Sequence, residues 1–188
     1  GSKQAFRLMR RIGILGDIGS GKSYIANSFG YPVFNADQEV EKIYKKNKKV
    51  FLKLKKILPK YIYSYPINKF EITNAILSNK NNLKKIIKVV HFEVRKKMRL
   101  FLRKNKNKNF VILDIPLLLE NKLNKKNDIL IYIDANKENI LKKLKKRKNF
   151  NLKLFYKFKK IQLPLAYKKQ KSDFVIKNNF SKKSIKKD

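Results

Sequence analysis

Residues 16 to 23 carry the clearest chemistry of the sequence, because they read Gly-Asp-Ile-Gly-Ser-Gly-Lys-Ser and fit the phosphate-binding pattern G-x-x-x-x-G-K-[ST]. The glycines allow successive backbone N–H groups to converge on a phosphate. Lys22 would reach the β and γ oxygens of a nucleoside triphosphate, and the hydroxyl of Ser23 would bind Mg²⁺. The sequence therefore predicts a nucleotide-binding loop, together with the residue that follows it: Gly16, Asp17, Ile18, Gly19, Ser20, Gly21, Lys22, Ser23 and Tyr24.

The segments on either side of this loop have the patterns that such a loop needs. Residues 11–15 are apolar and strand-sized, and residues 22–29 read as an amphipathic helix. The N-terminus of that helix would direct the positive end of its dipole at the bound phosphates. Backbone, dipole, lysine and metal would thus hold one nucleotide together.

Two carboxylates that follow apolar strands are candidates for the chemistry around this loop. Asp114 ends the run 111–114, which is typical of a carboxylate that faces a phosphate-binding loop near Mg²⁺, although an aspartate here can also cap the following turn. Asp37 follows the strand 32–35 and would lie beside the loop, where a substrate hydroxyl awaits phosphoryl transfer. Asp37 is also suited to cap a helix that begins near Gln38, and both roles can hold.

Strand-like and helix-like segments alternate along the chain, which predicts an α/β fold: a mainly parallel sheet with helices on both faces, in three α/β/α layers. We expect a helical substrate-binding insert at 39–106 and a lid at 142–165. Pro59 and Pro66 must divide the insert into more than one helix. The expected core covers 10–38 and 108–180, and its five strands are 11–15, 32–35, 110–114, 129–133 and 174–176.

The length and composition set the outer limits. The chain of 188 residues suits one domain, and it has no cysteine, which excludes disulfides and thiolate metal sites. Its longest apolar runs are too short to cross a membrane, and no signal-type segment is apparent, so we expect a cytoplasmic protein without a membrane partner. Gly1 and Ser2 resemble the remainder of a cleaved tag, residues 1–8 carry no functional argument, and Met9 is expected near the natural start.

The sequence is strongly basic, with 49 lysine and arginine residues against 13 aspartate and glutamate residues and a formal net charge of +36. Such a charge ordinarily indicates nucleic-acid binding. Here the lysines are spread along the whole chain and accompany many Asn, Ile, Phe and Tyr residues, all of which have A- and T-rich codons. We interpret the charge as drift in genomic base composition, and we expect only salt-sensitive, non-specific adhesion to nucleic acid.

Taken together, the motifs resemble those of the dephospho-coenzyme A kinase family. The resemblance spans about residues 12–179, and its most specific part is the Asp-Ile-Pro-Leu-Leu-Leu-Glu run at 114–120. The other matching positions are the phosphate-binding loop, residues 33–37, His91, Asp134, Glu138, Arg147, Gln162, Pro164, Lys168 and residues 172–178. ATP and Mg²⁺ as cofactors, and dephospho-CoA as the second substrate, become expectations through this resemblance.

The resemblance implies transfer of the γ-phosphoryl group of ATP to the ribose 3′-hydroxyl of dephospho-CoA, the last step of coenzyme A synthesis. Asp37 would accept the hydroxyl proton, and Lys22 and Arg147 would stabilise the phosphoryl group, the latter from the lid. Asp114 would support the metal or the substrate pocket, and Asn178 would lie near the adenine. The pocket for dephospho-CoA would include His91, Asp114, Pro116, Leu117 and Glu120. Of the oligomeric states, a monomer is favoured.

Four positions depart from the family pattern. Asn35 replaces the first aspartate of the usual Asp-Ala-Asp, Phe92 replaces a proline, Lys143 replaces a lid arginine and Tyr24 replaces a threonine. Lysine keeps the charge of arginine but lacks the planar fork that binds phosphate bidentately, so a weaker lid contribution is expected. The fold and the reaction remain expected, and these changes bear on catalytic efficiency.

Two other classes of function remain open from the sequence. One is another small-molecule kinase or NTPase with the same loop, and the other is a basic nucleic-acid-binding protein that uses nucleotide as a switch. Against a GTPase switch, residues 124–128 only approximate the guanine-reading pattern N-K-x-D. His91, the single histidine, lies on a segment of helical apolar periodicity and is expected to shape the substrate pocket rather than to transfer protons.

Overall fold

The structure is a computed structural model that describes residues 8–180, so Gly1 and Ser2, the expected tag remainder, lie outside the described residues. The described chain forms two compact units. The first contains residues 8–35, 101–150 and 159–180, and the second contains residues 36–100 and 151–158.

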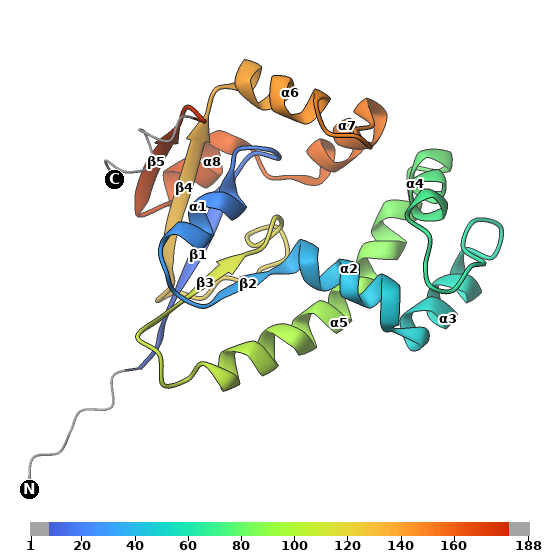
Figure 1. The fold of residues 1–188 in the computed structure, drawn as a ribbon, viewed down its shortest axis with the longest axis horizontal. Coiled ribbons are helices and arrows are strands. Elements are labelled where there is room, and N and C mark those ends of the chain that lie inside the picture. The colour runs from blue at the N-terminus through green and yellow to red at the C-terminus, as the bar shows by residue number, and fades with distance from the viewer. Residues whose placement is uncertain (1–7, 181–188) are drawn as a thin grey trace, which may run out of the picture. The chain divides into compact units, whose positions relative to one another are not determined.

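The first unit is built on a five-stranded sheet in which all neighbouring strands are parallel (Figure 1). The strands are β1 (Arg10–Gly16), β2 (Val33–Asn35), β3 (Phe110–Asp114), β4 (Ile129–Ala135) and β5 (Phe174–Asn178), in the spatial order β2-β3-β1-β4-β5. The predicted α/β fold is thereby confirmed. Because the strands are parallel, their carboxyl ends meet at one edge, where Asn35 lies opposite Asp114.

Helices pack against this sheet, whose strands β1 and β3 are buried apart from their first residues. The helical residues of the first unit are α1 (Lys22–Ser28), α6 (Lys137–Lys145), α8 (Leu165–Lys171), the last turn of α7 (Leu152–Ile161) and the end of α5 (Asn82–Lys104), and of these α1 and α8 contact the strands. Alternate residues of β1 point to opposite faces, so Ile14 packs with Ile25 of α1 on one side. On the other side Gly13 is covered by Leu118, whose methyl group would clash with any Cβ at that position. The segment after β3 is therefore seated directly on β1.

The second unit is helical. It contains α2 (Ala36–Lys46), α3 (Lys48–Ile57), α4 (Lys69–Ser78), most of α5 (Asn82–Lys104) and most of α7. The side chains of Asn47 and Asn68 accept hydrogen bonds from backbone N–H groups in the first turns of α3 and α4. Pro59 and Pro66 lie between these two helices, so the predicted division of the region into several helices is confirmed.

The start of α2 differs from the sequence-based expectation. The helix begins at Ala36, directly after β2, which places Asp37 inside the first turn. Asp37 is therefore not the helix cap, and that alternative role was wrong. Its carboxylate still lies near the positive end of the α2 dipole, where a negative charge is favourable.

A buried carboxylate fixes the loop that precedes α4. Glu71 Oε1 accepts hydrogen bonds from the backbone N–H groups of Tyr63 and Ser64, at 2.8 and 3.0 Å. Burial acts to raise the pKa of Glu71, but these hydrogen bonds outweigh it and hold the pKa below its usual range. An ionised side chain thus satisfies two backbone donors inside the second unit.

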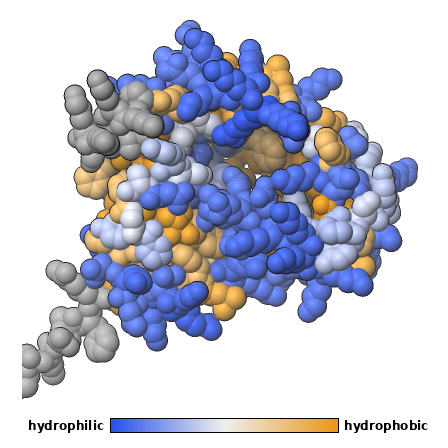
Figure 2. Space-filling view, in the orientation of Figure 1, coloured by the Kyte–Doolittle hydropathy of each residue, from blue (hydrophilic) through white to orange (hydrophobic). Residues whose placement is uncertain are grey.

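Hydrophilic side chains cover most of one face of the described chain (Figure 2). Figure 2 shows hydrophilic side chains across the face in view, with smaller hydrophobic areas between them. Among residues 8–180, no helix combines the length and the apolar character that crossing a bilayer requires.

Candidate nucleotide-binding site

The predicted phosphate-binding loop connects β1 to α1 at the carboxyl edge of the sheet (Figure 1). Gly19 and Gly21 have φ angles of 77° and 89°, in the left-handed region that favours glycine. Each also makes a close approach. A Cβ on Gly19 would lie 3.0 Å from Leu144 of α6, and a Cβ on Gly21 would collide with Nδ2 of Asn178. The loop therefore depends on glycine for both its backbone conformation and its packing.

Asn178, at the end of β5, holds the loop from one side. Its side chain is buried, its Nδ2 donates a hydrogen bond to the carbonyl of Ser20 at 2.9 Å, and its Oδ1 accepts one from the backbone of Phe180 at 2.9 Å. Both polar atoms of the amide thus fix protein backbone beside Gly21. The expected place of Asn178 near adenine stays a prediction.

The two predicted magnesium-binding side chains meet at the start of α1. Ser23 Oγ donates a hydrogen bond to Asp114 Oδ2 at 2.6 Å, and Asn35 Nδ2 donates to the same oxygen at 3.2 Å. Asp114 is buried, whereas Ser23 is exposed. Hydroxyl and carboxylate oxygens are ligands that suit Mg²⁺, which is commonly bound through one or two protein groups together with substrate phosphates. The residues therefore fit the expected metal.

Lys22 lies folded onto the loop that it belongs to. Its Nζ donates hydrogen bonds to the carbonyl oxygens of Gly16 and Asp17, at 3.2 and 3.0 Å. These partners are neutral backbone acceptors, which bind an ammonium group less strongly than phosphate oxygens do. Before any nucleotide binds, the side chain of Lys22 therefore already lies against the loop that would bind the phosphates.

A lysine that the sequence did not single out also reaches the loop. Lys159 Nζ lies 2.8 and 2.7 Å from the two carboxylate oxygens of Asp17, and Ile18 donates its backbone N–H to Asp17 Oδ1 at 2.8 Å. Asp17 is buried. In a chain rich in lysine, no pattern distinguishes Lys159, because its partner is 142 residues away in the sequence.

The segment at 116–120 is fixed by a buried ion pair. Glu120 Oε2 lies 2.5 Å from Lys168 Nζ and accepts a hydrogen bond from the backbone of Leu163 at 2.9 Å. The side chain of Lys168 is only 1% exposed. Pro116 and Leu117 are half-buried, and the expected contacts of this segment with substrate stay predictions.

The remaining predicted residues lie on other elements. Asp37, on α2, and His91, on α5, belong to the second unit. His91 is half-buried, and burial, followed by the positive charge of Arg95, holds its pKa below the usual range. Arg147 is exposed in the turn after α6, and Tyr24 is exposed on α1. The structure thus brings the loop, Asp114 and Asn178 together within one unit.

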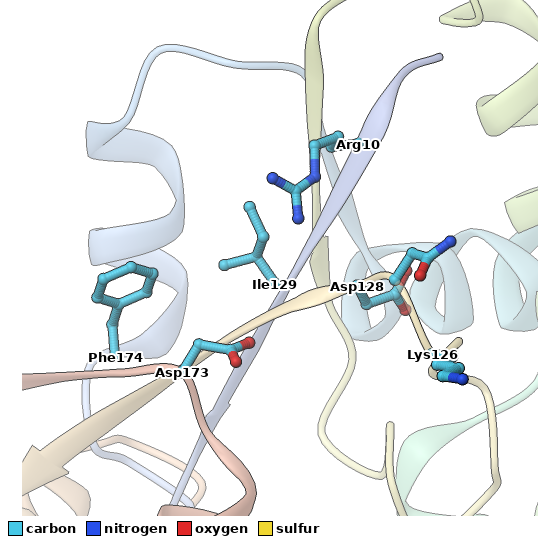
Figure 3. Close-up of a pocket in the computed structure, with 7 residues that line it drawn as sticks. Arg10, Lys126, Asp128, Ile129, Asp173 and Phe174 are labelled. Carbon is cyan, nitrogen blue, oxygen red and sulfur yellow. The ribbon is translucent and has the colours of Figure 1, made fainter.

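A separate pocket opens at the opposite, amino edge of the sheet, near the first residues of β1, β4 and β5. Its volume is about 450 Å³, and Figure 3 shows Arg10, Lys126, Asp128 and Asp173 around it. Asp128 accepts the N–H of Lys125, in the loop before β4, at 2.7 Å and pairs with Arg11 Nε at 3.1 Å, and Asp173 accepts the N–H of Leu130 of β4 at 2.8 Å.

Comparison with known proteins decides between the classes of function that the sequence left open. A family model described as dephospho-CoA kinase matches residues 10–184. The chain belongs to the dephospho-CoA kinase family. The dephospho-CoA kinase of Wolbachia sp. subsp. Brugia malayi (strain TRS) is 34% identical over 179 residues, which cover 93% of this chain and 91% of that protein. That of Rickettsia felis is 32% identical over 171 residues, with 89% and 87% covered. The predicted family, a class of ATP-using transferases, is confirmed.

Solved structures agree with this membership in the dephospho-CoA kinase family. The dephospho-CoA kinase from Campylobacter jejuni is 26% identical to this chain, with a TM-score of 0.59 and coverage of 93% of this chain and 90% of that one. A shikimate kinase from Bacteroides thetaiotaomicron, at 12% identity and a TM-score of 0.51, supports the fold alone.

Proposed function

We propose that this protein transfers the γ-phosphoryl group of ATP to the ribose 3′-hydroxyl of dephospho-CoA, which completes the synthesis of coenzyme A. The observation that carries the proposal is the phosphate-binding loop at the carboxyl edge of the sheet, with Ser23 hydrogen-bonded to Asp114 beside it. That arrangement, in a chain of the dephospho-CoA kinase family, has the parts that ATP-dependent phosphoryl transfer requires.

The loop would bind the phosphates through its backbone N–H groups and the N-terminus of α1. Lys22 would exchange the carbonyls of Gly16 and Asp17 for the β and γ oxygens, where its charge is more strongly bound. Ser23 and Asp114 would hold Mg²⁺, which when bound supplies charge neutralisation at the phosphates.

Acceptance of the hydroxyl proton is assigned to Asp37, in the first turn of α2. A carboxylate within hydrogen-bond reach of the attacking hydroxyl would orient it and take its proton as transfer proceeds. Arg147 would add positive charge at the transferring phosphoryl group. His91, Asp114, Pro116, Leu117 and Glu120 would line the dephospho-CoA pocket, and Asn178 would lie near adenine.

The proposal also covers the compartment, the oligomeric state and the macromolecular partners of the protein. Both substrates are small water-soluble molecules, so a cytoplasmic monomer is sufficient for the activity and a specific nucleic-acid partner is not needed. The positive charge is carried by lysines along the whole chain, which favours weak, salt-sensitive attraction of polyanions over a defined complex.

A coupled assay of ADP release with Mg²⁺-ATP tests the reaction, with dephospho-CoA, adenosine or no acceptor present. We expect stimulation by dephospho-CoA alone, with coenzyme A identified as the product by mass. Asp37→Asn should nearly abolish turnover while leaving ATP binding intact, whereas Glu41→Gln, which removes an exposed carboxylate from the same helix, should leave turnover unchanged. ATP binding without any stimulation by dephospho-CoA would reject the proposed acceptor, and full turnover in Asp37→Asn would remove that residue from the role of base.

A further inference from the structure

The phosphate-binding loop contains an anion of its own. Asp17 follows the first glycine of the motif, and only 7% of its side chain is exposed. Its backbone carbonyl accepts a hydrogen bond from Lys22 Nζ, and its Oδ1 accepts the N–H of Ile18 at 2.8 Å. A buried carboxylate this close to bound phosphates would repel them, because a negative charge in a region of low dielectric is poorly screened.

The ammonium group of Lys159 contacts this carboxylate directly. Lys159 comes from the last turn of α7 and contacts both oxygens of Asp17, at 2.8 and 2.7 Å, with 25% of its own side chain exposed. A two-point contact between an ammonium group and a carboxylate neutralises the charge and fixes the side chain of Asp17 at the same time. The first half of the loop is therefore held by Lys159 of the first unit, while Asn178 of β5 holds its second half.

We propose that Lys159 is a positioning residue of the nucleotide site, which neutralises Asp17 and so allows the loop to bind the phosphates of ATP. This inference rests on the proposed function in that it takes the loop as the ATP site. Lys159 acts through Asp17: without its ammonium group the buried carboxylate would oppose the incoming phosphates and compete for Lys22.

The test is a titration of ATP against the full chain by calorimetry, with melting temperatures measured in parallel. We expect Lys159→Ala to weaken ATP binding by about tenfold, the scale of losing one hydrogen-bonded charge pair. Lys160→Ala is the matched control, because it removes the same charge from the exposed neighbouring position and should leave the affinity within about twofold of the parent. Lys159→Arg, which keeps the charge, should bind ATP nearly as the parent does.

A second experiment removes the negative charge of Asp17 itself. Adding Asp17→Asn to Lys159→Ala should restore most of the ATP affinity that Lys159→Ala alone loses. A purely structural pair would lower the melting temperature of Lys159→Ala without changing its ATP affinity, and that result would overturn the inference. Failure of Asp17→Asn to rescue the double variant would overturn it as well.

Calorimetry measures ATP binding without dephospho-CoA, so the proposed function and the role of Lys159 can be rejected independently of each other. ATP binding with the expected pattern of variants, but no phosphorylation of dephospho-CoA, would reject only the proposed function. Normal phosphorylation of dephospho-CoA, together with unchanged ATP affinity in Lys159→Ala, would reject only the role of Lys159.

Discussion

The two edges of the parallel sheet carry similar residues in different arrangements. At the carboxyl edge Asp17 lies in the phosphate-binding loop and Asp114 lies beside it, and at the amino edge Asp128 and Asp173 lie beside a pocket with basic residues. The carboxyl-edge pair is bonded mainly to side chains, namely a hydroxyl, an amide and an ammonium group. The amino-edge pair accepts backbone N–H groups of the sheet and its adjoining loop, and Asp128 also pairs with the side chain of Arg11.

This difference in partners separates a binding site from a structural edge. A side-chain donor can exchange its partner for a ligand at little structural cost, whereas a backbone donor that loses its acceptor is left unsatisfied. The carboxyl edge also has the glycine-dependent loop and the N-terminus of α1, which present backbone donors. The residue types alone therefore do not make the site, and variants at matched positions can test the contrast.

The largest difference is expected between two lysines. Lys22→Ala should lower the rate of phosphoryl transfer by about 100- to 1,000-fold, because a preorganised positive charge at the transferring group is lost. Lys126→Ala, at the amino-edge pocket, removes the same charge and should leave the rate unchanged. Steady-state ADP release measures both, and equal losses in the two variants would contradict the contrast between the edges.

Substitution of two aspartates should affect different properties, the rate at the carboxyl edge and the stability at the amino edge. Asp114→Asn should reduce phosphoryl transfer by about 10- to 100-fold, since the oriented oxygen beside Ser23 loses its charge. Asp173→Ala should leave transfer unchanged but lower the free energy of unfolding by about 1 kcal/mol, because the N–H of Leu130 loses its acceptor. Rates and chemical denaturation of both variants measure this, and a catalytic loss in Asp173→Ala would extend the functional site to the amino edge.

A smaller change is expected from one methyl group at the carboxyl edge. Gly21→Ala places a side chain at a φ of 89° and against Asn178, so we expect weaker ATP binding and a loss of about 1–3 kcal/mol in the free energy of unfolding. Adding Asn178→Ala relieves the contact but not the backbone strain, and should recover only part of the stability. Full recovery would assign the whole effect to the contact.

The smallest effect is expected in the pH dependence of the amino edge. Burial outweighs the N–H of Lys125 and the charge of Arg11 and raises the pKa of Asp128 above its ordinary value of 3.8. A raised pKa means that the folded state holds the proton longer than the unfolded state, so this contribution to stability is complete below pH 3.8 and is lost as the pH rises through the folded-state pKa.

Asp128→Asn should therefore gain in stability relative to the parent as the pH rises from 3.5 toward neutral, as followed by melting temperature. The weak geometry of the pair agrees with this direction, because Arg11 Nε lies 3.1 Å from Asp128 Oδ1 yet has no hydrogen-bond partner among the described residues. If the parent instead became more stable relative to Asp128→Asn as the pH rises, the ion pair with Arg11 would outweigh the effect of burial on the pKa of Asp128.

Local sequence patterns predicted most of the strands and the place of the phosphate-binding loop. The limits of each predicted strand lie within two residues of the observed ones, because apolar runs and their bounding polar residues are properties of neighbours in the chain. The loop at 16–23 has the predicted setting between a strand and a helix. The start of α2 was misplaced because Ala36 follows the last residue of β2 without a separating turn, so no residue between the two elements marks the boundary.

The sequence by itself determined the order of the strands along the chain, the phosphate-binding loop and the family, since motif and periodicity are written in adjacent residues. Only the tertiary structure decided which lysine neutralises Asp17, that Glu120 pairs with the buried Lys168, and that Asn178 holds Ser20 across 158 residues of sequence. The physical reason is that 49 basic residues are nearly equivalent as charges in the sequence, and their partners are chosen by burial and distance in the folded chain.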